Sequence, residues 1–161
     1  MKKITLLMAA LAFSFYAMAD GMSGTYKVGT GETDPNFTSL KAACDALNTN
    51  GVAGDVILEI TSDLTENVNV GLGVNTNGYS ITIRPDQDAD RTITFTKLAD
   101  NTSPTGHFVI GYLGDGLTSA WSDANTIATS NVTIDGYAEG GSTRRLTFTN
   151  TNASHTNARV I

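Results

Sequence analysis

The chain has 161 residues, enough for about one domain with a hydrophobic core. It contains 24 Thr, 13 Asn, 11 Ser and 16 Gly, a composition that favours turns and hydroxyl-rich strands over helices. Ten basic residues against 16 acidic ones give a net charge of -6. Because nucleic-acid binding rewards clustered Lys and Arg, this balance argues against a nucleic-acid partner.

Residues 1–19 have the three parts of a secretory signal peptide. Two lysines open the segment, an uncharged run follows over 4–16, and the A-x-A sequence of a cleavage site occupies 17–19. The run is shorter than the roughly 20 residues that span a bilayer, which favours a signal peptide over an anchor. We therefore expect cleavage after Ala19 and a secreted or cell-surface protein, with no transmembrane segment in the mature chain and a net charge of -8.

The sequence over 34–50 predicts an amphipathic helix. Asn36 or Thr38 can cap its start, and Asn50-Gly51 supplies a left-handed stop. Its apolar residues recur at intervals of three and four, as one helix face requires: Phe37, Leu40, Cys44 and Leu47. The lone cysteine lies on that face with no histidine near it in the sequence, so we expect a buried thiol and not a nucleophile.

After Gly54 the apolar pattern changes to a period of two, which is typical of strands. The predicted strands are 55–60, 67–70, 79–85, 91–95, 107–113, 131–136, 145–150 and 158–161. We expect the last inward apolar residue of each to be Ile60, Val70, Ile83, Phe95, Ile110, Ile134, Phe148 and Ile161, with Ile83, Phe95, Ile134 and Phe148 pointing into one core. The longest interval contains the sequence 114–131, which predicts a long loop.

Two architectures place short strands at this spacing. An antiparallel β-sandwich does so, and Asn77-Gly78 could close one of its hairpins. A parallel β-helix also does so, because each coil turns through short strands that stack on a common apolar column. The helix before the strands, the repeated placing of Thr or Asn between two apolar residues, and the final apolar strand favour the β-helix.

The order of segments then resembles a known class of protein. The stretch over 24–60 reads GTYKVGTGETDPNFTSLKAACDALNTNGVAGDVILEI, and NVTIDG is followed by STRRLTFTN. These are similar to the start and a recurring coil of exported, pectin-lyase-like right-handed β-helix proteins of Bacteroidota. The resemblance implies a mainly β chain with a signal peptide (1–19), an N-terminal strand and capping helix (20–54), and β-helix coils (55–161). Because such proteins usually continue for several coils, we expect a fragment of a longer protein.

An acidic turn is the candidate metal site. Asp86, Asp88 and Asp90 alternate as in a calcium loop, but Arg91 and Lys97 stand where an EF-hand needs Gly and Glu. The turn is therefore either a looser Ca²⁺ site or a solvated acidic turn between two strands. Neither histidine has a partner at zinc-ligand spacing, so no zinc site is expected.

No catalytic residues are assigned. Asp135 with Arg144 or Arg145 could be imagined in lyase roles, but such a set is too common to be diagnostic. The candidate binding residues are aromatic, because sugar rings stack on aromatic faces: Trp121, Tyr112 and Tyr137. The competing interpretation is that Trp121 packs its loop onto the coil.

The leading hypothesis is an exported or cell-surface β-helix module with a structural or adhesin-like role and a polysaccharide or surface glycan as its partner. The alternative is the opening of a polysaccharide lyase or glycoside hydrolase whose catalytic coils lie beyond Ile161. Whether this portion itself is catalytic stays open, and the absence of assigned catalytic residues favours a non-enzymatic role.

Overall fold

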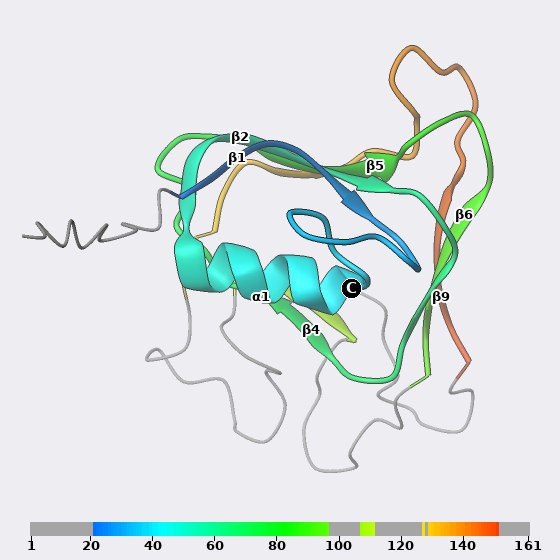
Figure 1. The fold of residues 1–161 in the computed structure, drawn as a ribbon, viewed down its shortest axis with the longest axis horizontal. Helices are drawn as coiled ribbons and strands as arrows, with labels where there is room; N and C mark the ends of the chain where they lie inside the picture. Colours follow the sequence, from blue (N-terminus) through cyan, green and yellow to red (C-terminus); the bar gives the residue numbers. More distant parts are fainter. Residues whose placement is uncertain (1–20, 97–106, 112–126, 128, 152–161) are drawn as a thin grey trace, which may run out of the picture.

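The computed structural model describes residues 21–96, 107–111, 127 and 129–151 (Figure 1). Several predictions lie outside these residues: the signal peptide with its cleavage site, the candidate binding residues Tyr112 and Trp121, and the strand over 158–161. Among the described residues, no helix has the length and apolarity needed to cross a bilayer.

The described chain consists mainly of strands with one helix. In order, the elements are β1 (Met22–Val28), α1 (Leu40–Asn50), β2 (Val52–Ile60), β3 (Leu64–Glu66), β4 (Val70–Leu72), β5 (Ile81–Pro85), β6 (Arg91–Phe95), β7 (Phe108–Ile110), β8 (Val132–Ile134) and β9 (Leu146–Asn150). They form three sheets with the orders β1-β2-β5-β8, β3-β6-β9 and β4-β7. Every pairing between these strands is parallel, so they do not form the antiparallel sandwich.

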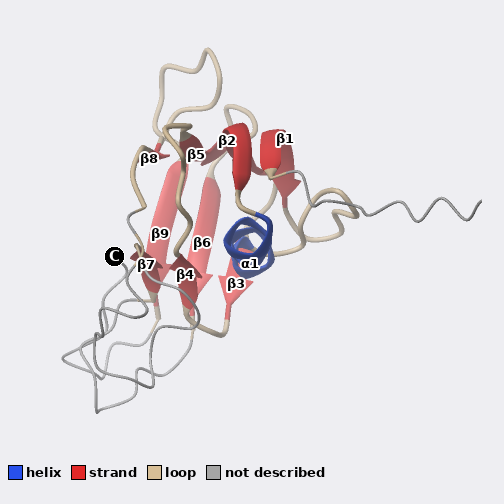
Figure 2. Cartoon of the chain, turned by 90° about the vertical axis from the view of Figure 1, so that its left-hand side faces the viewer, coloured by secondary structure: helices blue, strands red, loops and turns tan. Residues whose placement is uncertain are grey.

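The chain visits the three sheets in a fixed order. It runs from β2 through β3 to β4, then from β5 through β6 to β7, and then from β8 to β9. Figure 1 shows the sheets as sides of one layered body, and Figure 2 shows α1 beside β4, on the side that β4 and β7 also occupy. Helix α1 therefore lies next to β4, at the end of the structure where β1 and β3 also lie.

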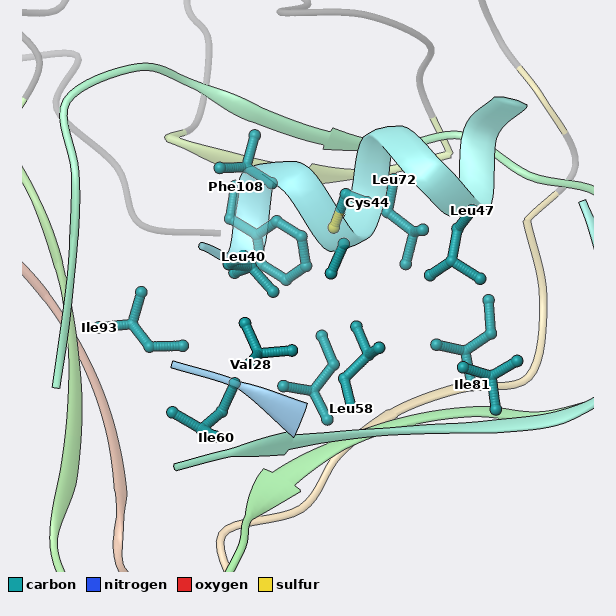
Figure 3. Close-up of a cluster of buried hydrophobic side chains, with 14 of the residues drawn as sticks. Val28, Leu40, Cys44, Leu47, Leu58, Ile60, Leu72, Ile81, Ile93 and Phe108 are labelled. Atoms are coloured by element: carbon teal, nitrogen blue, oxygen red, sulfur yellow. The ribbon is translucent and has the colours of Figure 1, made fainter. Parts of the chain in front are cut away.

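The core fills the space between the three sheets. Figure 3 shows side chains from the helix and from several strands meeting there. Alternation along the strands explains why: in β5 every second residue is buried, beginning with Ile81. The prediction for Ile83, Phe95, Ile134 and Phe148 is confirmed, because the first two are fully buried and the last two pack against the same cluster.

Parallel register brings aromatic residues of neighbouring strands together. Ile93 of β6 is the register partner of Phe148 in β9, and Phe95 is the partner of Asn150. The rings of Phe95 and Phe148 lie 6.4 Å apart and nearly parallel, and Phe148 stacks on Phe108 at 6.0 Å. Stacked aromatic rings of this kind add to the stabilisation that burial gives.

Helix α1 begins later than the sequence predicted. Its N-cap is Ser39, whose Oγ accepts a hydrogen bond from the Ala42 N–H at 3.1 Å, so neither Asn36 nor Thr38 caps it. A buried carboxylate from β3 completes the cap, because Glu66 Oε1 accepts from the Leu40 N–H at 2.6 Å and more weakly from Lys41 N–H at 3.4 Å. The predicted stop is confirmed: Gly51 has φ 74°.

One strand prediction was wrong in detail, and the hairpin that the sandwich alternative would use is not formed. Residues 67–70 are not one strand, since β3 ends at Glu66 and β4 begins at Val70. The turn at Asn77-Gly78 does adopt positive φ at both residues, but it joins β4 to β5 in different sheets and closes no hairpin. A turn sequence specifies the bend and does not specify which strands pair across it.

The segment between β1 and α1 folds over the beginning of the core (Figure 1). Phe37, predicted within the helix, instead forms a parallel bridge with Val28. Phe37 N–H donates to the Lys27 carbonyl and its own carbonyl accepts from Gly29 N–H, both at 2.9 Å. This segment therefore covers the C-terminal end of the outer edge of β1, which would otherwise be free to pair with another strand.

Candidate functional site

The acidic turn between β5 and β6 is held by two arginines. Arg91 contacts Asp86 Oδ1 through Nε at 3.0 Å and through Nη2 at 2.9 Å. Arg145 of the following coil donates from Nε to Asp88 at 2.9 Å and from Nη1 to Asp90 at 3.1 Å. The hydrogen bond to Asp88 raises the pKa of the Arg145 guanidinium most, and the hydrogen bond to Asp90 raises it further. Three carboxylates thus face two guanidinium groups.

This arrangement bears on the calcium hypothesis. Among the residues that the structure describes, no group of three or more His, Cys, Asp or Glu is placed to hold a metal ion. A Ca²⁺ ion at Asp88 and Asp90 would have to compete with Arg145, which binds one oxygen of each carboxylate. The Ca²⁺ site stays a prediction.

Tyr137 follows β8 and is 36% exposed. Its N–H donates to Asp135 Oδ1 at 2.9 Å, as in an Asx turn, and the Arg144 guanidinium lies 5.9 Å from the ring centroid. Arg144 therefore occupies part of the space in which a sugar would stack. Of the residues considered for lyase roles, Arg145 binds the acidic turn and Asp135 holds its own loop, while the Arg144 side chain lies beside Gly136.

The sheet β3-β6-β9 carries outward rows of threonine. Register aligns Thr65 with Thr94 and Thr149, and aligns Thr92 with Thr147. All five are exposed or half-buried. Neighbouring strands lie about 4.8 Å apart, so these hydroxyls form a regular polar array on one side of the body.

A pocket that the sequence did not indicate lies at the start of the fold. It has a volume of about 370 Å³ and lies between β1, residues 34–37 and helix α1. Its lining residues are Met22, Tyr26, Asp34, Pro35, Phe37, Ala46 and Asn50. The Tyr26 and Phe37 rings stand 5.7 Å apart between centroids with an interplanar angle of 44°. The pocket lining combines apolar and aromatic side chains with one carboxylate and one amide.

Sequence reasoning missed this pocket because three separate segments make it. The only local signal was Tyr26. It lies two residues before the buried Val28 and so on the same face of β1, but its hydroxyl favours a position at the edge of the core over one inside it. Phe37 was assigned to the helix face, and its true position depends on the bridge to Val28.

The position of Tyr112 and Trp121 relative to these features is not described, since both lie outside the described ranges. Comparison of the chain with protein-family models, with curated proteins and with solved structures finds no match.

Proposed function

We propose that the chain is an exported, right-handed parallel β-helix module of the pectin-lyase-like kind, with a structural or adhesin-like role at the cell surface and a glycan as its ligand. The observation that carries the proposal is the repeated passage of the chain through three parallel sheets in one order. A chain that coils in this way presents long, regular sides to its surroundings, which suits a binding or spacer role.

The contacts of the charged residues favour binding over catalysis by the described coils. Arg84 binds Glu59 at 2.8 Å and also Glu139, while Arg145 binds Asp88 and Asp90. These ion pairs join residues of successive coils, so the charged side chains stabilise the fold. A hydrolase would instead require a pair of carboxylates at either side of a sugar bond.

The coil architecture can be tested by disulfide trapping. Thr82 and Thr133 are register partners in β5 and β8, and the Cα separation of neighbouring strands suits a disulfide. We expect the double variant Thr82→Cys/Thr133→Cys to form an intramolecular disulfide on mild oxidation, detected by mass spectrometry of the digest. The control Thr82→Cys/Thr147→Cys places the thiols in two different sheets and should stay reduced. The reverse pattern in folded protein would refute the coil.

Export and binding need a separate experiment. The full chain is expressed in a Gram-negative host, and the exported product is sequenced from its N-terminus, where Asp20 is expected as the first residue. The purified product is then incubated with neutral and uronic polysaccharides in the presence of Ca²⁺. Retention on polysaccharide without release of sugar supports the adhesin-like role, whereas release of unsaturated or reducing ends would establish the lyase or hydrolase alternative.

A further inference from the structure

We propose that the pocket between β1, residues 34–37 and α1 is a binding subsite for one neutral pyranose ring. The inference rests on the proposed glycan-binding function and assigns it to a place other than the aromatic residues that the sequence suggested. Tyr26 and Phe37 supply the wall against which the apolar face of a sugar would stack.

The shape and lining of the pocket fit a small ligand with one apolar and one polar side. Its volume of about 370 Å³ lies near the lower end of the ~300–1,000 Å³ typical of ligand pockets. Both aromatic rings are half-buried, and Pro35 and Ala46 extend the apolar surface around them. A pyranose has C–H groups on its faces and hydroxyls around its edge, so it would place carbon against the rings and oxygen toward the rim.

The polar groups at the rim have capacity left for a ligand. Asp34 and Asn50 are both exposed, and within the described part of the chain neither side chain has a hydrogen-bond partner. Their neighbours differ: Asn36 Oδ1 accepts from Lys27 N–H at 2.9 Å, and Asp45 is paired with Lys41 at 2.7 Å. The unused carboxylate can accept two sugar hydroxyls, and the amide can both donate and accept.

The charge of the lining selects against acidic sugars. Asp34 is the one charged residue among the lining residues, and a uronate carboxylate placed beside it would be repelled. An ammonium ligand would suit Asp34 and the rings. On the other side of the pocket, however, it could bind only the amide oxygen of Asn50 and would leave the amide N–H groups unused. A neutral ring with hydroxyls on several carbons matches both polar groups.

The wall of the pocket is fixed before any ligand binds. Backbone hydrogen bonds on either side of Phe37 tie it to β1, and the Asn36 side chain adds a third bond to the same strand. Ordering this loop therefore costs nothing at the moment of binding, which favours recognition of a small ligand.

The test uses methyl glycosides and the exported protein. Saturation-transfer NMR and calorimetry measure binding of methyl β-glucopyranoside, methyl β-galactopyranoside, methyl α-mannopyranoside and methyl β-glucuronide. We expect at least one neutral glycoside to bind about 10-fold more tightly than the glucuronide. Phe37→Leu keeps apolar volume and removes the ring, and should weaken binding about 3- to 10-fold.

Two further variants make the result specific. Asp34→Asn has no structural partner to lose, so it should leave the melting temperature unchanged, weaken neutral-sugar binding several-fold and abolish the discrimination against glucuronide. Tyr79→Ala removes an aromatic side chain that is 41% exposed and outside the pocket, and should leave binding unchanged.

Three results would overturn the subsite. They are equal binding of glucuronide by the unmodified protein, binding insensitive to both Asp34→Asn and Phe37→Leu, and binding of tetramethylammonium in place of every neutral glycoside. If polysaccharide retention survives Phe37→Leu, the glycan-binding function stands and only its assignment to this pocket falls. If the unmodified protein retains no polysaccharide and binds no glycoside, both proposals fall.

Discussion

Replacing Glu66 tests the contact between helix α1 and strand β3 most directly. Its side chain is 3% exposed, and its Oε1 accepts the Leu40 N–H at 2.6 Å across 26 residues of sequence. Glu66→Ala would leave this buried N–H without a partner and would also remove the weaker contact with Lys41 N–H. An unsatisfied buried donor costs about 1–3 kcal/mol, so we expect the free energy of unfolding to fall by that amount.

The charge of Glu66 adds a dependence on pH. Burial raises the pKa of its carboxyl from the ordinary 4.5, and the N–H groups of Leu40 and Lys41 oppose that shift. Because the pKa is higher in the folded state, the contribution of Glu66 to stability is fully present below pH 4.5 and declines as pH rises through the raised value. Glu66→Gln keeps an acceptor oxygen and does not titrate. The free energy of unfolding of Glu66→Gln, compared with that of the unmodified protein, should therefore rise as pH increases from 4.5 to the raised pKa and stay constant above it.

Urea denaturation followed by circular dichroism between pH 4 and 8 measures both effects. Ser39→Ala is the matched control, since it removes the other side-chain cap at a cost of about 1 kcal/mol and introduces no pH dependence. The reasoning is refuted if Glu66→Ala costs less than Ser39→Ala, or if Glu66→Gln is as unstable as Glu66→Ala at every pH.

Other replacements test the core and its attachments. Phe95→Ala removes a fully buried ring and should lower the free energy of unfolding by about 3–5 kcal/mol in the same denaturation assay. Asn48→Ala breaks two 2.8 Å hydrogen bonds, to the Gly71 carbonyl and from the Gly73 N–H, and should cost about 1–3 kcal/mol, whereas Asn48→Asp should restore only the bond from Gly73. Burial raises the pKa of the Cys44 thiol, so iodoacetamide should label it only as fast as the protein unfolds, and rapid labelling in native buffer would contradict its burial.

The inward residues of the strands could be predicted because alternation is a local property. Ile83 and Phe95 each stand in a strand whose β-branched or aromatic residues recur at every second position, and each is buried as expected. The stop of the helix was also local, since Asn50-Gly51 needs no distant partner.

The contacts between segments far apart in the sequence could not be predicted. The start of α1 depends on Glu66, which reaches it from the next coil, and so the cap was placed at the wrong residue. Arg145 meets Asp88 from 57 residues away, so the ion pairs of the candidate metal turn could not be predicted from the local sequence. The pocket has the same origin, because Tyr26 and Phe37 become neighbours only through the bridge between their segments. Register is a long-range property, and a single sequence contains no direct signal for it.

The spacing between register partners has a thermodynamic consequence. Val56 of β2 pairs with Ile81 of β5, 25 residues later, whereas Ile81 pairs with Val132 of β8, 51 residues later. The entropy lost on closing a flexible loop grows only with the logarithm of its length, so this doubling costs about 0.6 kcal/mol. Burying one isoleucine side chain recovers more than that, at about 1.5–3 kcal/mol. Additional chain in the connections between β5 and β8 therefore costs the sheets little stability, and these connections can grow in length while the paired strands stay the same.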